Sequence, residues 1–269
     1  MRYSDGYGAH ARLWVPDRPR GAVLYLHGIQ SHGGWFEDSA RFLAEGGLAV
    51  LLPDRRGSGR NEAERGHAAS VRRWLLDAFE GLDELHVRTG LSRFHVVGVS
   101  WGGKLALGLY RFAPDRIAGL SLIAPGLFPR VDLPFGEKVR VGLSVIAGGK
   151  GLFDIPLNDP ELFTSSPDRQ FFIAKDPLRL RKVTASFLMC SRRLDRYALG
   201  AARDRTGCPL TVFLAGLDRI IDNDATREFV RRLSWPGRMI IEYPRAHHTL
   251  EFEPQRERFF SDLLASATG

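Results

Sequence analysis

The five residues Gly98-Val99-Ser100-Trp101-Gly102 constrain the fold of this 269-residue chain more than any other stretch. The β-branched pair Val96-Val97 precedes them and predicts a buried strand, and an apolar pattern with helical spacing follows directly. A strand that reverses into a helix so sharply crowds the positions two before and two after Ser100, where glycine avoids a clash. This context predicts a nucleophilic serine held at a tight strand-to-helix turn.

The rest of the chain alternates apolar strand patterns with helical patterns. Strands are expected at 11–15, 21–26 and 48–52, in the run before Ser100, and at 117–123, 210–214 and 238–243. Helices are expected at about 36–44, 68–89, from the serine turn to 113, and at about 224–233 and 254–264. Such alternation predicts an α/β fold with a mostly parallel central sheet and helices on both faces. In these sheets, sites form at the carboxyl ends of the strands.

Residues 126–206 interrupt this alternation. Prolines and phenylalanines are spread along the stretch, and no regular pattern runs through it. A long interruption in a compact fold usually has a function, and we expect an irregular inserted lid or cap here. The core domain is then expected to comprise residues 1–125 and 207–269. Part of this segment is expected to contact an apolar substrate, and most of its aromatic residues are expected to form the cap's own small core.

Composition excludes several classes of protein. The formal net charge is +7, but the arginines are scattered and no nucleic-acid-binding motif accompanies them, so no nucleic-acid partner is expected. The positive net charge leaves weak contact with an anionic lipid surface as an alternative. No apolar run is long enough for a membrane span, and no apolar leader is visible, which together favour a cytoplasmic location. Cys190 and Cys208 form neither a metal motif nor a disulfide framework and are expected to be reduced thiols.

A serine hydroxyl is a weak nucleophile, so it needs a base to take its proton and an acid to orient that base. Asp218 follows one late strand of the expected sheet, and His247-His248 follow the next. Because the carboxyl ends of parallel strands meet at one edge, Asp218 and one of the two histidines are expected near Ser100. The chain order serine, aspartate, histidine is that of the α/β-hydrolase fold.

Other polar residues near these loops have several interpretations. Asp222 and Asp224 are rival acids, but they are expected to cap the following helix. His32 and Trp35 lie in a glycine-rich loop after the second expected strand. They are expected either to line an acyl pocket or to order the loop, and the sequence does not decide between these roles.

The chain resembles α/β-hydrolases of the monoacylglycerol lipase and lysophospholipase group. The matching motifs are His27-Gly28 with Ser31-His32-Gly33-Gly34-Trp35, Asp54-Arg55-Arg56-Gly57-Ser58-Gly59, the pentapeptide around Ser100, Gly216-Leu217-Asp218 and His248-Thr249-Leu250. The resemblance covers most of residues 20–125 and 208–269, and only loosely the stretch between them. It implies the α/β-hydrolase fold and a serine hydrolase activity.

The resemblance also implies roles for individual residues. Ser100 is the nucleophile, His248 rather than His247 the base, and Asp218 the acid that orients it. The backbone N–H groups of Ile29 and Trp101 form the oxyanion hole. His27 is structural in this reading rather than catalytic.

The expected function is hydrolysis of medium- or long-chain acyl esters, such as monoacylglycerols or lysophospholipids, through an acyl-enzyme. No metal or cofactor is expected. Thioesterase or C–C bond hydrolase activity would use the same residues, and a non-catalytic ligand-binding protein with this fold is a further alternative. Haloalkane dehalogenase and epoxide hydrolase chemistry are disfavoured, because those enzymes carry aspartate where this chain has Ser100. The sequence does not indicate an oligomeric state.

Overall fold

Seven strands form the central sheet of the computed structural model, which describes residues 1–269. Their order across the sheet is β1-β3-β2-β4-β5-β8-β9. The strands are β1 (Ala11–Trp14), β2 (Gly21–Leu26), β3 (Leu48–Pro53), β4 (Phe94–Val99), β5 (Ile117–Ile123), β8 (Leu210–Ala215) and β9 (Arg238–Tyr243). All neighbours pair in parallel except β1 and β3. The predicted mostly parallel sheet is therefore confirmed.

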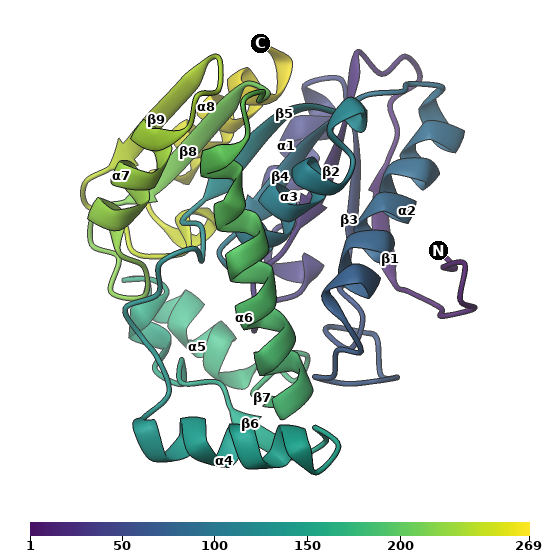
Figure 1. Cartoon of the computed structure of the whole chain (residues 1–269). Coiled ribbons are helices and arrows are strands. Elements are labelled where there is room, and N and C mark those ends of the chain that lie inside the picture. Colours follow the sequence, from purple (N-terminus) through teal and green to yellow (C-terminus); the bar gives the residue numbers. More distant parts are fainter.

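Helices cover both faces of this sheet. On one face, α2 (Val71–Thr89) packs beside α3 (Trp101–Phe112); on the other, α1 (Glu37–Glu45) packs against α8 (Arg256–Thr268). Figure 1 shows the first pair in front of the sheet and the second pair behind it. The central strands have continuous apolar sequences because the helices bury both of their faces. In β3 and β4, every residue is buried.

Several helix boundaries differ from the sequence prediction for identifiable reasons. Helix α2 starts three residues later than expected, because the Ser70 hydroxyl accepts a hydrogen bond from Arg73 N and caps it. Helix α7 (Asn223–Arg232) is capped by Asp222, whose carboxylate accepts from the N–H groups of Asp224 and Ala225. The prediction that Asp224 is also a cap is wrong, since it lies inside the first turn.

Residues 126–206, which we call the cap segment, contain more regular structure than expected. They form α4 (Phe135–Ile146), β6 (Leu152–Asp154), α5 (Pro167–Lys175), β7 (Lys182–Thr184) and α6 (Ala185–Leu199). The expectation of an irregular segment was wrong, because two of the prolines that suggested it stand at the starts of helices. Pro134 occupies the N-cap position of α4, and Pro167 is the first residue of α5. At these positions the missing N–H breaks no helical hydrogen bond.

The cap segment lies at one end of the molecule. Strands β6 and β7 pair only with each other in an antiparallel two-stranded sheet. Helix α4 lies farthest from the central sheet, and α6 runs from the cap segment back to the core, where it packs on α3 (Figure 1). Phe135, Leu143 and Ile146 of α4 are exposed.

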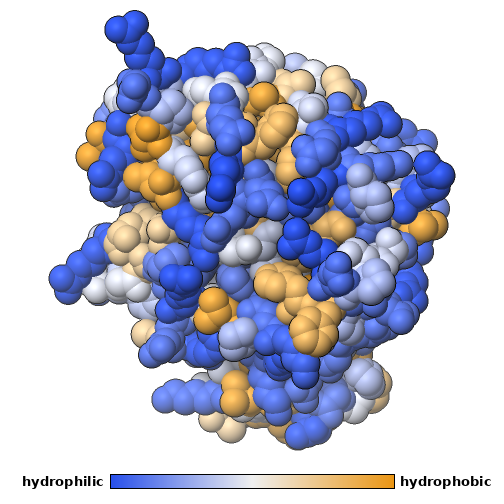
Figure 2. Space-filling view, turned by 180° about the vertical axis from the view of Figure 1, so that it is seen from behind, coloured by the Kyte–Doolittle hydropathy of each residue, from blue (hydrophilic) through white to orange (hydrophobic).

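Most of the surface seen from behind is hydrophilic (Figure 2). Seen from behind, hydrophobic residues are gathered in separate patches between polar ones (Figure 2). No helix combines the length and the apolar character needed to span a membrane.

The carboxyl group of Glu251 is one of several that are buried. Glu251 is buried, and its Oε1 accepts a hydrogen bond of 2.9 Å from Ser39 N, while its Oε2 has no partner. Burial raises the pKa of Glu251 to about 8, although the bonds from Ser39 lower it. The carboxyl group is therefore protonated in the folded protein at neutral pH.

The raised pKa of Glu251 makes the free energy of unfolding depend on pH. The folded state holds a proton on Glu251 that the unfolded chain releases near its ordinary value of 4.5. The stabilisation is complete below that value and is lost as pH rises toward about 8. The free energy of unfolding should therefore fall over this range, by at most about 1.4 kcal/mol per pH unit. Urea unfolding of wild type and Glu251→Gln from pH 5 to 8 measures the effect, and the variant should show a flatter profile. Parallel profiles would contradict it.

Candidate active site

The serine turn predicted from the sequence is present. Strand β4 ends at Val99 and helix α3 begins at Trp101, with Ser100 between them. The Ser100 backbone has φ 52° and ψ −119°, a strained conformation for a residue with a side chain. Ser100 N donates to Ile123 O (2.8 Å), and Ser100 O accepts from Gly126 N (2.7 Å), so neighbouring loops hold the turn in place.

The two glycines of the motif fit where a side chain would not. A Cβ on Gly98 would lie 2.6 Å from Gly102 O, and a Cβ on Gly102 would overlap Leu26 O at the end of β2. Both obstacles are backbone atoms, which a rotamer change cannot move aside. The glycines therefore allow β2, β4 and α3 to meet closely at Ser100.

Asp218 and His248 come together from the ends of the last two strands. Asp218 lies three residues after β8, and His248 lies in the loop after β9. Their side chains are buried, and His248 Nδ1 donates to Asp218 Oδ2 at 2.7 Å. The other carboxylate oxygen accepts from Ile220 N (2.8 Å) and Ile221 N (3.0 Å). The Asp218 carboxylate is thus fixed on both oxygens.

These contacts keep Asp218 ionised. Burial by itself raises the pKa of a carboxyl group, but the facing His248 and the two backbone N–H groups favour the charged form, and the pKa of Asp218 is lowered overall. Because the Nδ1–H group of His248 is hydrogen-bonded to Asp218, Nε2 of the ring is the nitrogen that is free to accept a proton.

Ser100 and His248 line one small cavity. The cavity has a volume of about 20 Å³ and also borders Gly28, Ile29 and Thr249. No hydrogen bond joins the Ser100 hydroxyl to the histidine ring, although the two groups face the same space. In enzymes without substrate, catalytic hydrogen bonds are often long and tighten only when substrate binds.

Two unpaired backbone N–H groups lie beside Ser100. A Cβ on Gly28 would stand only 3.4 Å from Ser100 Cβ, so the loop after β2 passes directly over the serine. The Ile29 N–H in this loop donates to no protein group. Trp101 begins α3, so its N–H has no acceptor within the helix. Both residues also line the larger cavity that contains Ser100.

Arg55 holds the loop that carries Ile29, a role the sequence did not indicate. Its guanidinium is buried over the Trp101 ring, 4.6 Å from the ring centroid, and donates to Gly28 O (2.9 Å) and Ile29 O (3.0 Å). His27 supports the same turn, since its Nδ1 donates to Gly28 O (2.8 Å) and its Nε2 accepts from Arg55 N (2.9 Å). Burial lowers the pKa of Arg55 to about 9, so it stays charged at neutral pH.

This arrangement makes Arg55→Lys informative. A lysine cannot hold two carbonyls in the planar fork of a guanidinium, so the loop and its Ile29 N–H should be less well fixed. If this N–H stabilises the transition state, kcat should fall about tenfold with little change in KM. Steady-state kinetics on an acyl ester measures both values. Arg60→Lys, at an exposed position in the loop after β3 that also carries Arg55, serves as control. An unchanged kcat would show that the loop needs no support from Arg55.

The cap segment is fastened to the loop after β2 and to the histidine loop. Asp176 accepts from Trp35 Nε1 (2.7 Å) and bonds His32 Nε2 (3.0 Å), and Thr249 N donates to Phe163 O (2.8 Å). His32 and Trp35 thus order the loop through the cap segment, and Trp35 also lines the small cavity.

His247 points elsewhere. Its N–H donates to Glu253 Oε2 (3.1 Å), and its ring lies 3.4 Å from the same oxygen. The structure therefore brings together Ser100, Asp218, His248, Ile29 and Trp101, and leaves His247 outside.

A larger cavity opens beside Ser100 between the core and the cap segment. It has a volume of about 320 Å³, and 11 of its 21 lining residues are hydrophobic. Val131, Leu133 and Leu188 come from the cap segment, and Ile220 and Ile221 from the loop after β8. This mainly apolar wall suits an alkyl chain. The chain contains no cluster of three or more histidine, cysteine or acidic residues that could hold a metal ion.

Several known proteins are similar to this chain. The sequence is 25% identical over 264 residues to monoacylglycerol lipase of Mycolicibacterium smegmatis, covering 94% of this chain and 90% of that protein. It is 31% identical to human monoglyceride lipase over 124 residues, 45% of this chain and 41% of that protein. The structure superposes on Paleococcus ferrophilus monoacylglycerol lipase with a TM-score of 0.86 at 22% identity, over 97% of this chain and 98% of that one.

A second solved structure supports the same fold. A soluble variant of Saccharomyces cerevisiae monoglyceride lipase, in complex with a substrate analogue, has a TM-score of 0.80 at 17% identity, with 98% of this chain and 93% of that one covered. The profile of the family described as serine aminopeptidase, S33, matches residues 17–255. The chain therefore belongs to this family of α/β-hydrolases and is similar to its monoacylglycerol lipases.

Proposed function

We propose that the protein is a serine ester hydrolase that cleaves acyl esters of the monoacylglycerol or lysophospholipid type. The observation that carries the proposal is the Asp218–His248 hydrogen bond of 2.7 Å in a loop that shares a cavity with Ser100. The mainly hydrophobic cavity on the other side of Ser100 supports an apolar acyl substrate. The similarity to monoacylglycerol lipases, which extends over 94% of the chain in one case, supports it independently.

Each group then has a defined task. His248 Nε2 takes the proton of Ser100 as the hydroxyl attacks the ester carbonyl, and Asp218 stabilises the resulting imidazolium. The N–H groups of Ile29 and Trp101 donate to the oxyanion of the tetrahedral intermediate. His248 returns the proton to the leaving alcohol, which leaves an acyl group on Ser100. Water then attacks the acyl carbonyl while His248 takes its proton. The bond to Ser100 breaks, the acid is released, and His248 returns the proton to the Ser100 oxygen.

The cap segment, residues 126–206, completes the substrate site in this proposal. It supplies most of the apolar wall of the large cavity and contacts the loops on both sides of Ser100. The remaining residues, 1–125 and 207–269, form the catalytic core.

A fluorophosphonate probe and a panel of esters test the proposal together. The probe should label the folded protein at Ser100, which peptide mass spectrometry locates. The protein should also hydrolyse p-nitrophenyl esters, monoacylglycerols or lysophospholipids of suitable chain length. A folded protein that is neither labelled nor active on any of these esters would refute the proposal. Turnover of acyl thioesters alone would replace the ester substrate with a thioester.

A further inference from the structure

Five charged residues lie in the wall of the large cavity that contains Ser100. They are Lys104, Asp132, Lys138, Arg192 and Asp195, and no other lining residue is charged. Charged side chains form no favourable interaction with an alkyl chain, and burying them against one is costly. A cavity that binds only an alkyl chain is therefore expected to have a hydrophobic wall throughout. The cluster therefore points to a second chemical group on the substrate.

Lys104 is the innermost of these residues. It lies in the first turn of α3, four positions after Ser100. The side chain is only 6% exposed and forms an ion pair with Asp195 of α6. Its Nζ also donates to Ser191 Oγ at 3.2 Å, and the same hydroxyl accepts from Trp101 Nε1 at 2.9 Å.

The burial of this ion pair needs an explanation. Taking two charges out of water costs several kcal/mol, and a hydrophobic pair of similar volume joins two helices as well or better. Packing between α3 and α6 therefore does not explain why these two residues are charged. Their position on the cavity wall explains it, because a buried charge acts strongly on a ligand in the same low-dielectric space.

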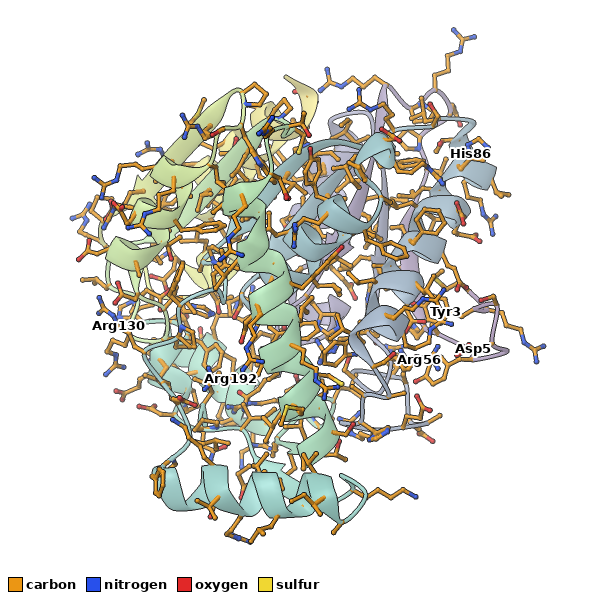
Figure 3. All side chains as sticks on the ribbon, viewed as in Figure 1. Tyr3, Asp5, Arg56, His86, Arg130 and Arg192 are labelled. Carbon is orange, nitrogen blue, oxygen red and sulfur yellow. The ribbon has the colours of Figure 1, made fainter.

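Arg192 and Lys138 form the outer part of the cluster and share one carboxylate. Asp132 Oδ2 lies 2.8 Å from Arg192 Nη2 and 2.7 Å from Lys138 Nζ. The remaining guanidinium donors of Arg192 have no protein acceptor. In Figure 3, Arg192 lies beside α6, above helix α4 of the cap segment. Its side chain is 52% exposed, so a substrate group can reach it.

The charges do not balance. Three cations face two carboxylates, which leaves one positive charge uncompensated in the cavity wall. A negatively charged group would neutralise it and accept the free donors of Arg192. We infer that this part of the cavity is a subsite for a carboxylate or phosphate group carried by the ester substrate, an inference that rests on the proposed esterase activity.

Two pairs of esters test this inference and distinguish the sources of the anion. In the first, the mono-p-nitrophenyl ester of suberic acid carries a carboxylate on the acyl part, and its methyl-capped form is neutral. In the second, lauroylglycerol phosphate carries a phosphate on the alcohol part, and monolauroylglycerol is neutral. For wild type, kcat/KM should be about tenfold higher for the anionic member of at least one pair. The pair that shows the preference identifies the part of the substrate that carries the charge.

Variants of Arg192 connect this preference to the cluster. Arg192→Gln balances two cations against two carboxylates and should remove the approximately tenfold preference, while Arg192→Glu should reverse it. Arg193→Gln, which changes an exposed neighbour that does not line the cavity, should keep the preference. High salt should weaken the preference, because the outer charges are exposed.

The outcomes separate this inference from the proposed function. Hydrolysis of the neutral esters without a preference in either pair would overturn the subsite and leave the esterase activity intact. A preference that Arg192→Gln and Arg192→Glu leave unchanged would overturn it as well. Absence of hydrolysis of all four esters, together with absence of labelling by the fluorophosphonate probe, would refute the proposed function itself.

Discussion

Replacement of Ser100 with alanine should lower kcat/KM for an acyl ester by at least about 10⁴-fold. Without the hydroxyl, no acyl-enzyme forms, and the residual rate depends on water and the backbone donors alone. Stopped assays at high enzyme concentration, with p-nitrophenyl esters as substrate, cover this range. Labelling by a fluorophosphonate probe should disappear in the same variant.

The fold should survive this substitution. Alanine keeps the Cβ that Ser100 already places in its strained conformation, and the backbone bonds to Ile123 and Gly126 do not involve the side chain. Circular dichroism and the thermal midpoint should therefore match wild type. Ser261→Ala, at an exposed position on α8, serves as the control for preparation and assay. Full activity of Ser100→Ala would show that another residue carries the chemistry.

The adjacent histidines should respond very differently to alanine. His248→Ala should lower kcat by about 10⁴-fold, because the variant loses the group that takes the serine proton and returns it to the alcohol. His247→Ala should leave kcat close to wild type, because that ring lies 21% exposed against Glu253, away from the nucleophile. Both variants remove the same atoms from the same loop, so each is the other's control.

Two readouts make the histidine comparison decisive. Steady-state kinetics at saturating substrate gives kcat, and thermal unfolding tests whether either variant disturbs the loop. His248→Ala also loses a buried partner of Asp218, and some loss of stability is expected with it. A greater loss of activity in His247→Ala would mean that the base has been assigned to the wrong histidine.

The core fold could be predicted from sequence because its signals are local. Each core strand is a short apolar run bounded by turn residues, and the expected ranges 21–26, 117–123 and 238–243 agree with the structure residue for residue. Asp218 and His248 could be placed near each other from topology alone, because each follows a strand whose carboxyl end lies at the same edge of the sheet.

The cap segment could not be predicted in the same way. Its prolines indicated irregular chain, yet those at the starts of α4 and α5 are compatible with helix. Strands β6 and β7 have three residues each, too few for an alternating pattern to be recognised. Their pairing depends on contacts between residues about 30 positions apart, which no local pattern encodes.

Arg55 and Lys104 were missed for a different reason. Arginine and lysine are rarely buried, so a charge within an otherwise apolar pattern predicts an exposed side chain. The contacts of Arg55 with Gly28 and Ile29, and of Lys104 with Asp195, become visible only once the chain is folded. Buried charges with long-range partners leave no signature in a single sequence.

The hydrogen bonds that join Asp176 and Phe163 of the cap segment to the loops around Ser100 affect how this enzyme could be redesigned. A chimaera whose new cap segment lacked an acceptor in place of Asp176 would lose the bonds to Trp35 and His32, and with them support of the loop that carries Ile29. Substrate range and turnover would then change together. Libraries that vary only side chains facing the cavity, such as Val131 and Leu188, leave those attachments intact and offer the more direct route to new selectivity.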